Sequence, residues 1–117
     1  MKKITPRFFT LLYLTLSTIA LPQAFAQCTH SIDLTDTFGD GWNGGTVTVN
    51  VNGSPVLTNI TLASGFGPQT FNFSANTGDV ITVIETAAGS WPSEMRVEVY
   101  DGNSTTIIGI LNPNPAP

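Results

Sequence analysis

The chain has 117 residues, of which 41% are hydrophobic and 10% are charged, and its formal net charge at pH 7 is −4. This length fits one small domain. An acidic chain repels the phosphate backbone of nucleic acids and anionic lipid headgroups, so its charge argues against both as partners.

Residues 1–26 have the pattern of a secretory signal peptide. Three basic residues lie within the first seven, an almost wholly apolar stretch follows at 8–20, and 24–26 (Ala-Phe-Ala) resembles a cleavage site. The apolar stretch is short for a membrane span. A lipoprotein signal ending at Cys28 is the alternative, but Gln27 stands where that signal needs a small residue. We therefore expect a secreted or cell-surface protein that begins at Gln27 and is not inserted in the membrane.

Removal of such a signal leaves a markedly acidic chain with a single cysteine. Arg96 is then the one basic residue against eight acidic ones, a formal net charge of −7 with His30 neutral. This balance favours divalent cations. Cys28 has no second cysteine to pair with inside the chain, so an intermolecular disulfide and an unreacted thiol are the two interpretations.

The rest of the sequence alternates with the period of a β-sheet. The clearest strand is 46–52, where every second residue is valine, and Asn52-Gly53 after it is a strong hairpin signal. Similar patterns predict strands at 31–35, 55–62, 69–74, 80–85, 95–100 and 105–111. Turn signals recur about every 8–12 residues and no helical period is present, which predicts an antiparallel β-sandwich of seven or eight strands over 27–111. Jelly-roll and immunoglobulin-like arrangements both fit, and the proline-rich tail at 112–117 is expected to be extended or disordered.

The most specialised segment is 36–45, which holds two carboxylates, one carboxamide and four glycines. Asp36, Asp40 and Asn43 offer the hard oxygen atoms that calcium prefers, and glycine lets backbone carbonyls turn inward as further ligands. We therefore expect a calcium site in this loop. The alternative is an ion-free glycine-rich turn in which Asp36 and Asn43 bond the backbone.

The same segment carries a family resemblance. Residues 34–45 (L-T-D-T-F-G-D-G-W-N-G-G) resemble the signature of a module that recurs in secreted proteins of Bacteroidetes-type bacteria, and 89–95 (G-S-W-P-S-E-M) resemble its second signature. The likeness covers about residues 28–111. It implies an adhesive or structural role without catalysis, and it makes Glu94 the carboxylate that joins the loop ligands from elsewhere in the fold. Relatives often carry several copies and further cysteines, whereas this sequence has one copy and one cysteine.

Each of the two signatures contains a tryptophan, Trp42 in the first and Trp91 in the second. They can close one end of the core over the ion, or form an exposed platform for sugars. We favour the core interpretation because no cluster of aromatic residues accompanies either tryptophan in the sequence.

Together these features predict a secreted, non-enzymatic, calcium-stabilised module in adhesion or extracellular assembly, such as a matrix or filament subunit. One route to assembly is donation of a strand, at 29–34 or 105–111, to a neighbouring molecule. An enzyme is not expected, because few nucleophilic or basic side chains are present. The alternative function is a carbohydrate-binding module that uses Trp42 or Trp91.

Overall fold

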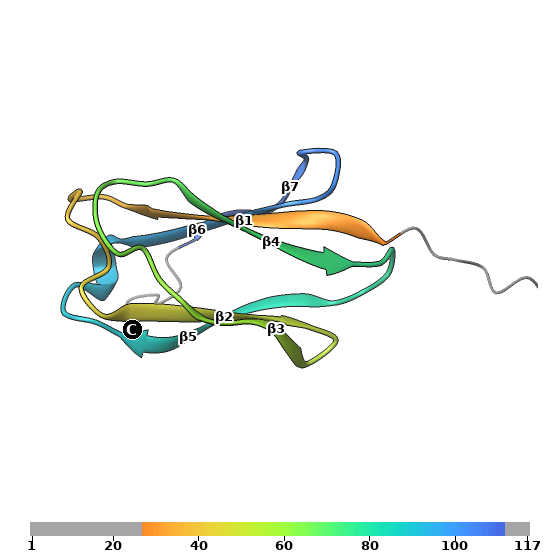
Figure 1. Cartoon of the computed structure of the whole chain (residues 1–117), viewed down its shortest axis with the longest axis horizontal. Coiled ribbons are helices and arrows are strands. Elements are labelled where there is room, and N and C mark those ends of the chain that lie inside the picture. The colour runs from red at the N-terminus through yellow and green to blue at the C-terminus, as the bar shows by residue number, and fades with distance from the viewer. Residues whose placement is uncertain (1–26, 112–117) are drawn as a thin grey trace, which may run out of the picture.

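The structure is a computed structural model that describes residues 27–111, and these form two antiparallel sheets packed face to face (Figure 1). The predicted all-β sandwich is therefore confirmed. The expected signal peptide at 1–26 and tail at 112–117 lie outside the described residues.

One sheet has four strands in the order β4-β1-β6-β7, and the other has three in the order β3-β2-β5. The strands and one 3-10 turn span β1 (Cys28–Asp36), β2 (Gly45–Val51), β3 (Ser54–Ile60), β4 (Gln69–Ala75), β5 (Ile81–Ala88), η1 (Pro92–Glu94), β6 (Met95–Tyr100) and β7 (Thr106–Leu111). Each predicted strand is present, although β1 begins earlier and β5 ends later than the sequence pattern suggested. No helix in the described residues has the length and apolar character needed to cross a membrane.

The strand order differs from that of an immunoglobulin constant domain. In an immunoglobulin constant domain the first two strands pair within one sheet, whereas here β1 and β2 lie in opposite sheets. β1 is hydrogen-bonded to β4 on one side and to β6 on the other. Residues 29–34 therefore occupy the middle of a sheet, while β7 pairs with β6 and has an open side. Of the two segments considered for strand donation, only β7 is at an edge.

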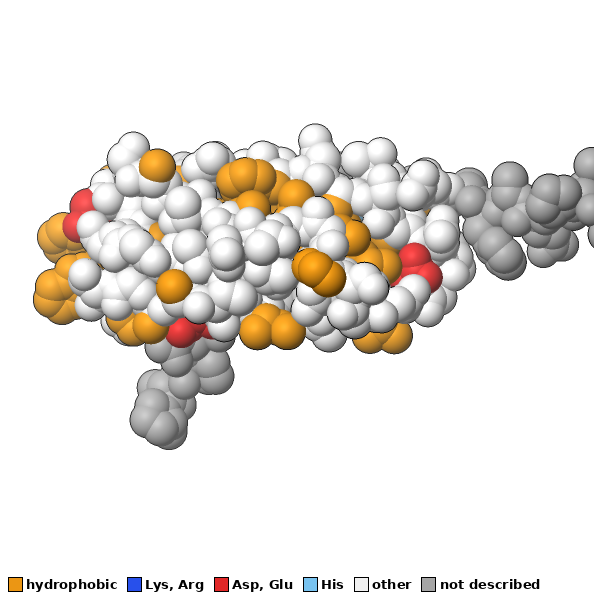
Figure 2. All heavy atoms as spheres, turned by 60° about the horizontal axis from the view of Figure 1, so that its bottom comes forward, with side chains coloured by type: hydrophobic (Ala, Val, Ile, Leu, Met, Phe, Trp, Pro, Cys, Tyr) orange, Lys and Arg blue, Asp and Glu red, His pale blue; other side chains and the backbone are white. Residues whose placement is uncertain are grey.

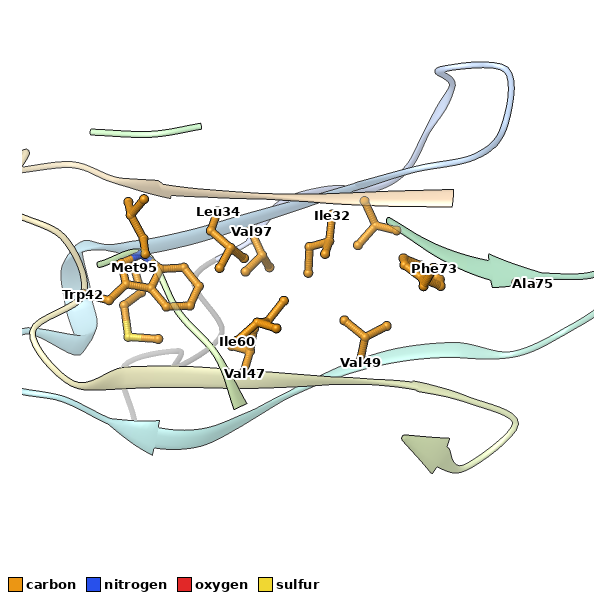
Figure 3. Close-up of a cluster of buried hydrophobic side chains, with 12 residues drawn as sticks. Ile32, Leu34, Trp42, Val47, Val49, Ile60, Phe73, Ala75, Met95 and Val97 are labelled. Carbon is orange, nitrogen blue, oxygen red and sulfur yellow. The ribbon is translucent and has the colours of Figure 1, made fainter. Parts of the chain in front are cut away.

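The core lies between the sheets and follows the predicted alternation (Figure 3). Ile32 and Leu34 of β1 face Val47 and Val49 of β2, and all four are fully buried. Burying such a side chain stabilises the fold by about 1.5–3 kcal/mol relative to leaving it exposed. The complete buried set is Ile32, Leu34, Trp42, Val47, Val49, Ile60, Leu62, Phe73, Ala75, Met95, Val97 and Val99.

The connections divide between the two ends of the sandwich (Figure 1). One end carries tight turns, including Asn52-Gly53, whose φ angles of 53° and 79° are the positive values that a hairpin turn of this type requires. The other end carries the three longer connections, β1–β2 at 37–44, β3–β4 at 61–68 and β5–β6 at 89–94. The residues of both sequence signatures therefore meet at one end.

A cavity-forming substitution tests the placement of the core. Leu34→Ala removes a fully buried side chain and is expected to destabilise the protein by about 2–5 kcal/mol. Val56→Ala is the control, because Val56 is exposed on β3 and its truncation should change stability by less than about 0.5 kcal/mol. Denaturant unfolding measures both. Equal effects of the two substitutions would contradict the assigned core.

Candidate metal centre

The loop after β1 is fastened to the end of the sandwich by Trp42. Its indole is 1% exposed, and Nε1 donates a hydrogen bond to the backbone oxygen of Thr35 at 2.8 Å. Its backbone N–H donates to the Leu62 carbonyl at 2.9 Å. Figure 3 shows the indole beside Met95 at the end of the core. The core interpretation therefore fits Trp42.

Close packing of the loop depends on Gly41. Its φ is +87°, and a Cβ atom there would lie 2.8 Å from the Leu62 carbonyl oxygen and 2.8 Å from backbone atoms of Ser64. A side chain at this position would therefore push the β1–β2 loop away from the β3–β4 loop.

Asp36, the last residue of β1, places a carboxylate beneath this loop. The residue is 4% exposed, and its Oδ2 accepts hydrogen bonds from the backbone N–H groups of Gly39 at 2.5 Å and Asp40 at 3.1 Å. Its other oxygen, Oδ1, is buried and has no hydrogen-bond partner within residues 27–111. Burial of an unpaired carboxylate oxygen is costly unless a cation approaches it. The Oδ2 atom of Asp36 thus makes the turn contacts, and Oδ1 is the oxygen that a cation could approach.

The strand register brings Glu94 to the same place. Asp36 pairs with Met95 across β1 and β6, so Glu94 lies beside the residues that follow Asp36. The Glu94 carbonyl accepts a hydrogen bond from the Thr37 N–H at 3.1 Å. Its side-chain Oε2, like Oε2 of Glu85 on β5, is also buried without a hydrogen-bond partner in the described part of the chain.

These contacts assemble a carboxylate triad of Asp36, Asp40 and Glu94. One carboxylate oxygen from each residue lies within 4.8 Å of those of the other two. Asp36 is buried, Glu94 is half-buried and Asp40 is exposed, so the triad runs from the interior to the surface. Of the four ligands expected from the sequence, the structure brings these three together.

The triad gathers three acidic side chains in one place. Burial, and then the negative charges of Asp36 and Asp40, raise the pKa of the Glu94 carboxyl above its usual value. Arg96, the one basic residue in the described part of the chain, donates through Nη1 to the Ser93 and Met95 carbonyls at 2.8 and 2.7 Å. A divalent cation among the three carboxylates would reverse the repulsion.

Asn43, the fourth expected ligand, makes local hydrogen bonds through its side-chain nitrogen and its backbone. Its Nδ2 donates to the Gly41 carbonyl at 3.1 Å, and its backbone adopts a positive φ of 48°. The backbone carbonyl of Asn43 accepts a hydrogen bond from the Ser90 N–H at 3.2 Å. These are the turn contacts that the ion-free alternative expects for Asn43.

Aromatic side chains surround the surface side of the triad. A pocket of about 340 Å³ is lined by Phe38, Asp40, Trp91 and Glu94. Phe38 is 70% exposed and Trp91 is 57% exposed, so the core interpretation is wrong for Trp91. Phe66, 63% exposed, lies against Gly39, where a Cβ atom would overlap its ring. Figure 2 shows apolar side chains beside acidic ones at this end of the molecule.

Sequence reasoning missed Phe38 and Phe66 as surface residues. Both stand next to glycine in loops, Phe38 before Gly39 and Phe66 between two glycines, outside any alternating strand. An aromatic residue in that setting has no inward face of a strand to occupy, and this signal could have identified them.

Cys28 lies at the opposite end of the sandwich. It is the first residue of β1, is half-buried and pairs in register with Ala75. With His30 and Asp101 it lines a second pocket of about 170 Å³. The two interpretations of Cys28, an intermolecular disulfide and an unreacted thiol, both stay predictions.

Comparisons of the chain with protein-family models, curated proteins and solved structures found no match. The resemblance to the secreted bacterial module therefore stays an inference from the two signatures.

Alanine substitutions at two glycines distinguish the cost of disturbing the packing between loops from the cost of a positive φ alone. Gly53→Ala should cost about 1–2 kcal/mol, because φ is +79° and nothing lies within 4 Å of the added Cβ. Gly41→Ala should cost clearly more, since it adds a clash with Leu62 and Ser64 to a similar φ. Denaturant unfolding measures the difference, and equal costs would show that the loops do not pack as described.

The repulsion within the triad predicts an unusual stabilising substitution. In chelator at pH 7, Glu94→Gln should raise the unfolding midpoint, because it removes one of three clustered charges and places an amide donor near Asp36. Glu98→Gln removes an equal charge from β6 outside the triad and should give no comparable gain. A lower midpoint for Glu94→Gln in thermal melts would contradict the repulsion.

Proposed function

We propose that the protein is a secreted, non-enzymatic β-sandwich module in adhesion or extracellular assembly, and that calcium bound to Asp36, Asp40 and Glu94 stabilises one end of it. The observation that carries the calcium site is the Asp36 Oδ1 atom. It is buried, has no hydrogen-bond partner and belongs to a carboxylate that lies within a triad of acidic side chains.

Calcium fits this triad better than other metals do. All three side chains offer hard oxygen atoms, and calcium takes about six to eight of them at roughly 2.3–2.6 Å in flexible geometry. Backbone carbonyls and water would complete the shell. Transition metals prefer imidazole or thiolate ligands, and His30 and Cys28 line the pocket near Asp101 at the other end of the sandwich.

The position of the triad supports a structural role for the ion. Asp36 ends β1, Asp40 lies in the β1–β2 loop and Glu94 ends the β5–β6 connection. A shared cation would therefore join two connections that are far apart in the sequence. A small domain whose sequence contains one cysteine has no internal disulfide to do this, and extracellular modules commonly bind calcium with a Kd of about 10⁻⁴–10⁻³ M.

The exposed aromatic residues beside the triad support an adhesive role. Phe38, Phe66 and Trp91 expose most of their surface at the same end of the sandwich. Exposed apolar side chains gathered in one place mark binding surfaces. The signal-peptide pattern at 1–26 supports export to the compartment where such contacts form.

Thermal melting with and without calcium tests the proposal. At a free calcium concentration about one hundred times the Kd, binding should stabilise the fold by about 2.7 kcal/mol, which raises the midpoint by about 10–20 °C in a domain of this size. Asp40→Asn should lose most of this rise, because Asp40 is an exposed ligand whose replacement leaves the core intact. Asp33→Asn, an equal charge change on β1 outside the triad, should keep it.

No calcium-dependent rise, or the same rise in Asp40→Asn as in the unmodified protein, would overturn the proposed site. Magnesium in place of calcium is a further control, because it demands near-ideal octahedral geometry and should stabilise the protein less.

A further inference from the structure

We propose that the bound calcium faces the aromatic pocket and there coordinates neighbouring hydroxyl groups of a neutral sugar, whose ring packs on Trp91 and Phe38. This inference rests on the proposed calcium site and adds its ligand class. Its first support is the pocket itself, which has Asp40 and Glu94 in common with the triad and Phe38 and Trp91 on its other walls.

The geometry leaves the ion open on one side. Asp36 approaches from the interior, where its Oδ1 is buried without a partner, while Asp40 is exposed and Glu94 is half-buried. With one oxygen from each residue, the three carboxylates fill only part of a shell of about six to eight oxygens. The remaining positions lie on the side of the pocket, where a ligand from solution can replace water.

The net negative charge of the proposed site favours an uncharged oxygen ligand over an anionic one. Calcium with three carboxylates leaves a formal charge of −1 at the site, and the pocket lining of Phe38, Asp40, Trp91 and Glu94 contains no basic side chain. Arg96, the one basic residue among residues 27–111, is bonded to the Ser93 and Met95 carbonyls. A phosphate, sulfate or carboxylate group would therefore meet net repulsion, whereas a pair of sugar hydroxyls brings two oxygens and no charge.

The aromatic side chains that line the pocket suit the apolar face of a sugar ring. A sugar ring has an apolar face of C–H groups, which packs on the electron-rich face of an aromatic ring. Trp91 and Phe38 offer such faces, at 57% and 70% exposure, next to the carboxylates. A volume of about 340 Å³ lies at the small end of the usual range for ligand pockets, about 300–1,000 Å³, so we expect one or two sugar units to be held.

Affinity electrophoresis of the full exported chain tests the inference. Gels contain mannan, galactan, xylan or dextran, with calcium or with chelator, and a matched gel contains the same polymer after periodate oxidation and reduction, which destroys neighbouring hydroxyl pairs. We expect at least one intact polymer to retard the protein in calcium only, and its oxidised form not to do so.

Single substitutions test which residues of the pocket contact the sugar and which bind calcium. Trp91→Ala should weaken retardation by about tenfold or more and keep the calcium-dependent rise in melting temperature, because Trp91 lines the pocket but offers no carboxylate. Asp40→Asn should lose both. Val80→Ala, which truncates an exposed apolar side chain in the β4–β5 connection, should lose neither.

The outcomes separate this inference from the calcium site. A calcium-dependent melting rise without retardation by any of the four polymers overturns the sugar inference and leaves the calcium site standing. Retardation that persists in chelator, or that oxidised polymer reproduces, overturns coordination of the sugar by calcium. Calcium-dependent self-association detected by light scattering and abolished by Trp91→Ala would assign the pocket to a second copy of the chain. Absence of any calcium effect overturns both proposals.

Discussion

The burial of one carboxylate is the constraint on which this end of the sandwich depends. Asp36 ends the central strand β1, and its Oδ2 holds the following loop through the N–H groups of Gly39 and Asp40. The same burial leaves Oδ1 without a partner. A buried, unpaired carboxylate oxygen weakens a fold of modest size unless something compensates for it. The local order of the loop and the reason to propose a cation there therefore arise from one side chain.

The neighbouring loops add to this constraint. The register that pairs Asp36 with Met95 places Glu94 beside it, and η1 connects that glutamate to Trp91 through the bond from the Glu94 N–H to the Trp91 carbonyl. Trp42, in contrast, anchors the first loop in the core. Trp42 is thus part of the core, whereas Trp91 is exposed. Trp91 lies on the side of the triad where a bound ion would face solvent.

Much of the fold could be predicted because its information is local. Alternating valines at 47, 49 and 51 and the Asn52-Gly53 turn determine β2 and its hairpin with β3 without reference to the rest of the chain. The sheet order could not be predicted, because the pairing of β1 with β4 and β6 joins residues that are distant in sequence. Asp36 and Asp40 could be proposed as ligands because they lie in one loop, whereas the proposal of Glu94 needed the resemblance of the second signature. The exposure of Phe38, Phe66 and Trp91 could not be predicted, because it depends on how three loops pack.

A crystal structure of the protein grown with calcium would show whether the triad holds a cation. We expect one calcium ion bound by oxygens of Asp36, Asp40 and Glu94 at about 2.3–2.6 Å, with Asp36 Oδ1 among its ligands and the pocket side filled by water or a hydroxyl ligand. A structure in which the triad holds only water, and Asp36 Oδ1 accepts a hydrogen bond from a protein donor instead, would contradict it.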